Sequence, residues 1–200
     1  MSSGRRTQAE RSEATRTALL AVARCLFAER GYASVGTEEI VREAGVTRGA
    51  LYHHFEGKRE LLDAVYEQLE AQLAQELAET LVPGASVLDT LRVGAETFLD
   101  RCLEPEIQQI VLLDAPAVLG WERWREIGAQ YGLGLISALL TAGIDAGEIR
   151  AQPVEPLAHA LLGSLDEIAM YVARAPDQNA AREQAGETVA ALVEGLKPRR

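Results

Sequence analysis

Residues 45–58, GVTRGALYHHFEGK, combine a short apolar skeleton with many side chains that can donate hydrogen bonds. Leu51 and Phe55 are four residues apart, so they share one face of a helix. The remaining positions must then face out, and they include an arginine, a tyrosine and two adjacent histidines. A guanidinium can bind a guanine edge or a phosphate, and hydroxyl and imidazole groups can donate to phosphate oxygens. This pattern therefore predicts contact with a nucleic-acid duplex.

The candidate contacts fall into two groups. Small residues allow a helix backbone to approach bases, and the Ala50 methyl group can also touch a thymine methyl, so base reading is assigned to Arg48, Gly49, Ala50 and His53. Phosphates suit hydroxyl, imidazole and ammonium groups and the free N–H groups of helix starts. The candidate phosphate contacts are Thr37, Thr47, Tyr52, His54 and Lys58.

Other interpretations of these residues are open. Adjacent residues on a helix diverge by about 100°, so His53 and His54 cannot easily share one metal ion, and no metal site is expected. A lone tyrosine in a helix is usually structural, and Arg48 could be a solvated charge. The neighbours of Tyr52 and Arg48 in the sequence favour the phosphate and base contacts.

The elements that must position these residues are all helical. Three helices fall within residues 15–55, and a turn at residues 44–46 joins the last two, which is the helix-turn-helix arrangement. Thr37 and Thr47 are the expected N-caps of the two short helices. A long helix follows Gly57, and five further helices are predicted at roughly 86–103, 105–114, 121–146, 154–174 and 178–196. No period-two pattern indicates a strand, so the predicted fold is all-α with about nine helices, after a disordered arm at residues 1–12.

A longer stretch resembles a known family. TRTALLAVARCLFAERGYASVGTEEIVREAGVTRGALYHHFEGKRELLDAV, residues 15–65, closely resembles the N-terminal domain of TetR-family transcriptional regulators. In that family the positions matching Thr37, Arg48, Tyr52, His54 and Lys58 contact DNA, and those matching Gly49 and Ala50 lie against the bases. Glu38 departs from members that have a basic residue there, which places more of the base reading on the third helix. The resemblance implies a DNA-binding domain at 13–60 and an effector-binding and dimerisation domain at 61–200.

Charge is distributed unevenly along the 200 residues. Residues 1–60 hold ten Lys and Arg against eight Asp and Glu, whereas residues 61–200 hold ten against 22, within a net charge of −10. A local basic surface can bind phosphate on an acidic molecule. No apolar run approaches the about 18 residues of a membrane span, and the polar N-terminus lacks the apolar segment of a secretory signal. Cys25 and Cys102 are expected to be buried and reduced, in a cytoplasmic protein without a cofactor.

The body is expected to pair with a second copy and to hold a small molecule. Helix-turn-helix proteins usually bind DNA as dimers, and the last two predicted helices can form a four-helix bundle with those of a partner. The candidate interface residues are Leu157, Leu161, Leu165, Ile168, Val189, Leu192, Val193 and Leu196. The candidate effector-pocket residues are Phe98, Cys102, Leu113, Asp114, Trp121, Trp124, Tyr131, His159, Asp166 and Met170.

The function predicted from these features is a ligand-responsive transcriptional repressor that acts as a homodimer on a double-stranded operator with two-fold related half-sites. An activator of the same fold is the alternative, because both need the same DNA-binding head. A helical enzyme is disfavoured, since no GxSxG, HExxH, glycine-rich phosphate loop or metal spacing occurs. A helical adaptor with a vestigial helix-turn-helix is disfavoured by the intact set of candidate DNA contacts.

Overall fold

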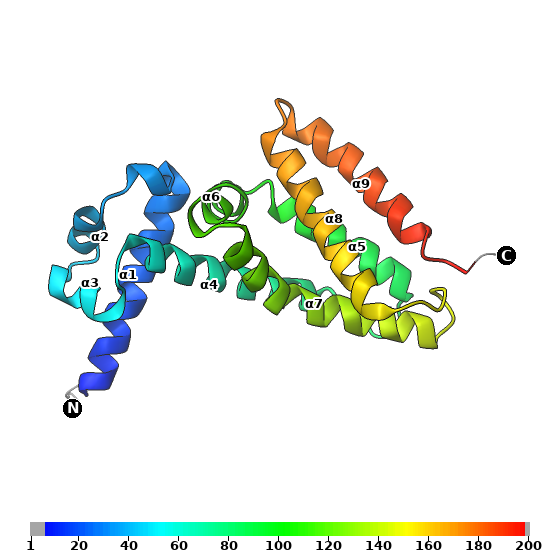
Figure 1. Cartoon of the computed structure of the whole chain (residues 1–200), viewed down its shortest axis with the longest axis horizontal. Coiled ribbons are helices and arrows are strands. Elements are labelled where there is room, and N and C mark those ends of the chain that lie inside the picture. The colour runs from blue at the N-terminus through cyan, green and yellow to red at the C-terminus, as the bar shows by residue number, and fades with distance from the viewer. Residues whose placement is uncertain (1–6, 199–200) are drawn as a thin grey trace, which may run out of the picture.

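The computed structural model describes residues 7–198, and every regular element in that range is helical (Figure 1). Helices α1, α2 and α3 form a head at one end, α4 leads away from it, and α5 to α9 form the body. The elements are α1 Gln8–Arg30, η1 Tyr32–Ser34, α2 Thr37–Glu43, α3 Arg48–His54, α4 Lys58–Glu79, α5 Val87–Arg101, η2 Ile107–Asp114, α6 Ala115–Leu119, α7 Trp121–Asp145, α8 Val154–Arg174 and α9 Gln178–Glu194. The predicted all-α fold with about nine helices is confirmed.

The head is a helix-turn-helix held by a small apolar core. Leu51 and Phe55 are buried, as predicted, together with Phe27 of α1 and Ile40 of α2. Gly45 has φ of +66°, a left-handed conformation that suits glycine and turns the chain sharply between α2 and α3. Because one face of α3 is fixed in this core, its opposite face must lie at the surface.

The first helix begins earlier than the sequence suggested. Thr7 and Glu10 form a capping box: the Thr7 N–H donates to Glu10 Oε2 at 2.7 Å, and the Glu10 N–H donates to Thr7 Oγ1 at 3.2 Å. The predicted disordered arm was therefore too long, since residues 8–12 are helical. Residues 1–6 of that arm lie outside the described residues.

The predicted helix 105–114 does not stop before Pro116. Residues 107–114 form a π-helix, η2, in which the Ala115 N–H donates to the Ile110 carbonyl, and α6 continues it with proline in its first turn. The next bond of the same spacing would run from residue 116 to the Val111 carbonyl, but Pro116 has no N–H and cannot donate it. The Trp124 indole N–H donates to that carbonyl instead, at 2.9 Å. Pro116 therefore leaves the Val111 carbonyl free to accept a hydrogen bond from α7, and this bond holds α7 against η2.

Helix α7 crosses the body. Contrary to the sequence-based expectation, it is long and apolar enough to span a membrane by length and composition. It packs, however, against α4, α5, α6 and α8. A core helix of a soluble bundle passes the same test, so this one helix is weak support for a membrane role.

The two cysteines differ in their surroundings. Cys102 is fully buried at the end of α5, and burial raises the pKa of its thiol. Cys25 is exposed on α1, where its thiol lies 3.4 Å from Glu29 Oε1, so the expectation that both are buried was wrong.

Candidate nucleic-acid interface and ligand cavity

The outer face of α3 carries the predicted base-reading residues. Thr47, Arg48, Gly49 and His53 are exposed, Ala50 is partly buried, and Tyr52 is 46% exposed. Thr47 is the N-cap, as predicted, because its Oγ1 accepts the Ala50 N–H at 3.1 Å. The Thr47 hydroxyl proton stays available for another acceptor.

Arg48 is held loosely beside two neighbours. Its Nη1 lies 3.5 Å from Glu38 Oε1, and its guanidinium lies 5.6 Å from the centre of the Tyr52 ring. Both side chains of the ion pair are well exposed, at 67% for Arg48 and 83% for Glu38. Exposed pairs of this kind are worth at most about 1 kcal/mol, so Arg48 remains free to exchange Glu38 for another acceptor.

Two of the predicted phosphate contacts are placed differently from the expectation. Gly36, not Thr37, is the N-cap of α2, so Thr37 occupies the first helical position and is partly buried. Lys58 points into the head: its ammonium donates to the carbonyls of Tyr32 and Val35, both at 2.8 Å, and lies 3.9 Å from the centre of the Tyr32 ring. Burial lowers the pKa of Lys58. The Lys58 side chain therefore holds the loop around η1. Backbone N–H groups at the start of α4 are better placed than the Lys58 ammonium to bind a phosphate.

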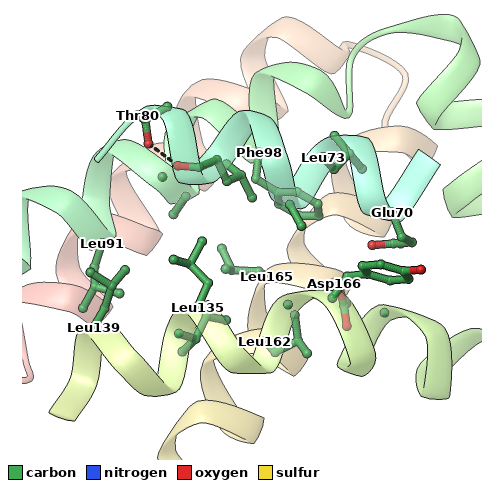
Figure 2. Close-up of a pocket in the computed structure, with 18 of the residues that line it drawn as sticks. Glu70, Leu73, Thr80, Leu91, Phe98, Leu135, Leu139, Leu162, Leu165 and Asp166 are labelled. Atoms are coloured by element: carbon green, nitrogen blue, oxygen red, sulfur yellow. Dashed lines mark hydrogen bonds between the residues drawn. The ribbon is translucent and has the colours of Figure 1, made fainter. Parts of the chain in front are cut away.

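The body contains an elongated cavity of about 110 Å³ between α4, α5, α7 and α8 (Figure 2). Leucine is the most frequent residue type in its wall, as at Leu73, Leu135 and Leu165. Six residues of the wall carry polar side-chain groups: Glu70, Thr80, Thr90, Trp124, Tyr131 and Asp166. The carboxyl groups of Glu70 and Asp166 lie close together at one end, and Thr80 lies toward the other.

The cavity contains only part of the predicted pocket. Phe98, Trp124, Tyr131 and Asp166 line it, as predicted. The other six candidates do not belong to its wall. Cys102 and Met170 are buried elsewhere, and Trp121 and His159 are exposed. Val111 and Leu112 line the cavity in place of Leu113, and Asp114 contacts the head. The missed residue with the clearest chemistry is Glu70. It follows Tyr66 by four positions and precedes Leu73 by three, so its place inside an apolar helix stripe could have revealed it.

The two carboxyl groups have different partners. Asp166 forms an ion pair with Arg125, whereas among the described residues Glu70 forms no ion pair with a lysine or arginine. Burial raises the pKa of Glu70 to about 7, an effect that the nearby Asp166 reinforces and the Tyr66 hydroxyl opposes. Burial raises the pKa of Asp166 to about 6, and Arg125 limits that rise.

One segment connects the cavity with the head. Val111 and Leu112 of η2 line the cavity, while the ends of the same segment bind the head. At its last residue, Asp114 Oδ2 accepts the Tyr32 N–H at 2.7 Å. At the other end, Glu106, the residue before η2 begins, accepts two hydrogen bonds from the Arg24 guanidinium, at 2.7 and 2.6 Å. A shift of η2 at the cavity wall would therefore act directly on α1 and η1.

Models of known protein families match both the head and the body. The family model described as "Bacterial regulatory proteins, tetR family" matches residues 19–65. The model described as "Tetracyclin repressor-like, C-terminal domain" matches residues 88–196, which is more than half of the chain. The chain belongs to the TetR family. The predicted DNA-binding transcriptional regulator is thereby confirmed.

Individual TetR-family relatives agree over most of the chain. The TetC protein of transposon Tn10 from Escherichia coli is 30% identical over 168 residues, which cover 82% of this chain and 83% of TetC. The regulator CymR from Pseudomonas putida is 37% identical over 123 residues, covering 60% of this chain and 61% of CymR. The crystal structure of a TetR-family transcriptional regulator from Pectobacterium atrosepticum is 38% identical, with a TM-score of 0.84 over 97% of this chain and 100% of that one.

The residues predicted for the TetR-type dimer face are not all available to a partner. Val189, Val193 and Leu196 are buried in the core of this chain, so they cannot form the interface as proposed. Leu157, Leu161, Leu165 and Ile168 are partly buried, and Leu165 lines the cavity. Leu192 is 44% exposed, and Tyr171 of α8 is 55% exposed.

Replacing Thr47 by alanine is expected to lower the free energy of unfolding by about 1 kcal/mol, because the Ala50 N–H loses its cap. Thr47→Ser keeps the hydroxyl and should retain most of the free energy of unfolding that the alanine variant loses. Urea unfolding followed by circular dichroism measures both. If the serine and alanine variants were equally destabilised, the cap would not be the stabilising feature.

Replacing Lys58 by methionine is expected to destabilise the head without changing the salt dependence of DNA binding. The carbonyl groups of Tyr32 and Val35 lose their donor, which costs about 1 kcal/mol of stability. The salt dependence should stay the same, because an ammonium held by these carbonyls does not bind a DNA phosphate. Urea unfolding and DNA titrations at several salt concentrations test this. A flatter salt slope in Lys58→Met would show that the ammonium leaves its carbonyls to bind phosphate.

Proposed function

We propose that this TetR-family regulator is a dimeric repressor that leaves its operator when a small molecule occupies the cavity between α4, α5, α7 and α8. The observation that carries the proposal is the double role of η2, which forms part of the cavity wall and holds the head through Glu106 and Asp114. Its DNA target gives it a cytoplasmic place of action.

The proposed mechanism is a shift between two states. In the DNA-binding state two α3 helices lie about 34–36 Å apart, one turn of B-DNA, so that both enter the major groove. A ligand that fits the cavity better in a state with another spacing depopulates the DNA-binding state. It can do so only by its difference in affinity for the two states, typically about 1–3 kcal/mol.

We propose that the partner subunit docks on the outer faces of α8 and α9. The two helices lie side by side along one edge of the body (Figure 1), and the exposed Tyr171 and Leu192 supply apolar contact area. Light scattering after size-exclusion chromatography should give a mass near twice 21.7 kDa. A monomer would remove the basis for a two-fold operator.

Selection of random duplexes with the purified protein tests the proposed function. We expect enrichment of a sequence with two-fold related half-sites. A reporter gene placed behind that sequence should be silenced by the protein and restored by a ligand that releases the DNA in vitro. Expression that rises with the protein would identify an activator, and no enriched sequence would contradict the proposal.

A further inference from the structure

The acidic end of the cavity has one positive charge for two carboxyl groups. Glu70 and Asp166 both lie at this end (Figure 2), and the only cation paired with them among the described residues is Arg125, on Asp166. When both carboxyl groups are ionised, this end of an apolar cavity carries one uncompensated negative charge. Burying an unpaired charge is costly, and the carboxyl group either takes up a proton or binds a counter-charge.

The polar neighbours of Glu70 do not supply that charge or enough donors. Tyr66, on the same helix, has one hydroxyl proton, which it donates to the Trp124 carbonyl at 3.0 Å, so its effect on the pKa of Glu70 comes without a charge. Tyr131, on α7, donates its hydroxyl proton to Glu67 at 3.2 Å. Cys102, at the end of α5, keeps a neutral thiol, because burial raises its pKa. Glu70 therefore lines the cavity with the Tyr66 hydroxyl nearby, which opposes the rise of its pKa, but with no cation paired to it among the described residues.

We propose that the ligand of this cavity is an elongated lipophilic amine, whose ammonium group binds between Glu70 and Asp166 while its hydrocarbon part lies along the leucine walls. This inference rests on the proposed function, because it specifies the chemistry of the effector at the same cavity. A carboxylate ligand would place a third negative charge beside one guanidinium. A neutral alcohol would fill the walls but leave the charge of Glu70 uncompensated.

Octylamine, 1-octanol and octanoate are suitable probes, because they have equal chain lengths and differ in charge. Isothermal titration calorimetry of the full-length protein without DNA gives the three affinities. At pH 8 octylamine should bind at least about tenfold more tightly than 1-octanol, and octanoate should bind most weakly, since hydrogen bonds to charged groups are stronger than neutral ones. Glu70→Gln should abolish the preference for the amine. Glu79→Gln, an exposed carboxylate on the same helix outside the cavity wall, should keep it.

The affinity for octylamine should also depend on pH. The amine stays protonated between pH 5.5 and 8. Glu70, whose pKa is raised to about 7, and Asp166, whose pKa is raised to about 6, are both mostly neutral at the lower pH and mostly ionised at the higher one. The affinity is therefore expected to rise about tenfold over this range, and binding at pH 6.5 should release protons into the buffer. Titrations in buffers of different ionisation enthalpy measure that release in the unmodified protein, without reliance on a variant that folds poorly.

The outcomes separate this inference from the proposed function. The inference is overturned if octylamine binds no better than 1-octanol, if octanoate binds best, if none of the three binds, or if Glu70→Gln keeps the preference. Release of the selected operator by some other compound would then still support the repressor. If octylamine binds through Glu70 but leaves the operator complex intact, the assignment of the cavity is supported and the proposed release mechanism fails.

Discussion

Arg48→Ala is expected to weaken binding to the selected operator by about 1–3 kcal/mol, while binding to random DNA changes much less. The physical reason is the position of Arg48 in the first turn of α3, where its side chain is exposed and extends away from the core. A guanidinium there can bind a guanine edge bidentately, a contact that random sequence does not supply. Titration of both duplexes with the variant measures the change in the specificity ratio.

The neighbouring Glu38 gives this prediction a second, finer test. The carboxylate lies 3.5 Å from the guanidinium, so it must give up Arg48 before Arg48 can reach a base. Glu38→Gln should therefore strengthen operator binding slightly, because an acid near the phosphates is removed as well. Arg150→Ala removes an exposed arginine of the body and serves as the control. An equal loss on operator and random DNA in Arg48→Ala would show that Arg48 contacts only the backbone.

The double variant Glu106→Gln, Asp114→Asn is expected to bind the operator but to be released poorly by the effector. Both carboxylates hold the head to η2, through Arg24 and through the Tyr32 N–H. With both charges removed, displacement of η2 by a ligand would pull less strongly on α1 and η1. We expect the coupling free energy between ligand and operator to fall by about 1–2 kcal/mol.

This coupling is measured as the ratio of operator affinities with and without saturating ligand. Asp89→Asn, which removes an exposed carboxylate within α5, is the matched control and should leave the ratio unchanged. Ligand affinity for the free protein should stay similar, because neither Glu106 nor Asp114 lines the cavity. Undiminished release in the double variant would show that the signal travels along another path, such as α4 itself.

The head was more predictable from the sequence than the body, for a physical reason. The head is built from local signals: Gly45 at the turn, Thr47 at the cap, and the spacing of Leu51 and Phe55, all within a dozen residues. Thr37 was an exception, since Gly36 is the N-cap of α2, and Lys58 was another. Its long stem allowed either an outward or an inward ammonium, and only the folded loop with the Tyr32 and Val35 carbonyls decides between them.

The cavity depends on packing between distant helices, which periodicity does not reveal. Trp121 and Trp124 are three residues apart and were both predicted to line the pocket, yet Trp121 is 60% exposed and Trp124 is 3% exposed. Asp114 and Asp166 were both proposed as polar handles, but Asp114 binds the head while Asp166 faces the cavity. The α9 residues showed the same ambiguity, since an apolar stripe serves a chain's own core as well as a dimer face.

The central claim is that the exposed face of α3 reads a duplex, and a crystal structure with the selected operator tests it most directly. The account predicts α3 in the major groove, with the Arg48 guanidinium on a base edge, Ala50 against the bases and the Tyr52 hydroxyl on a phosphate. A complex in which α3 lies away from the groove, or in which Arg48 stays paired with Glu38, would contradict it.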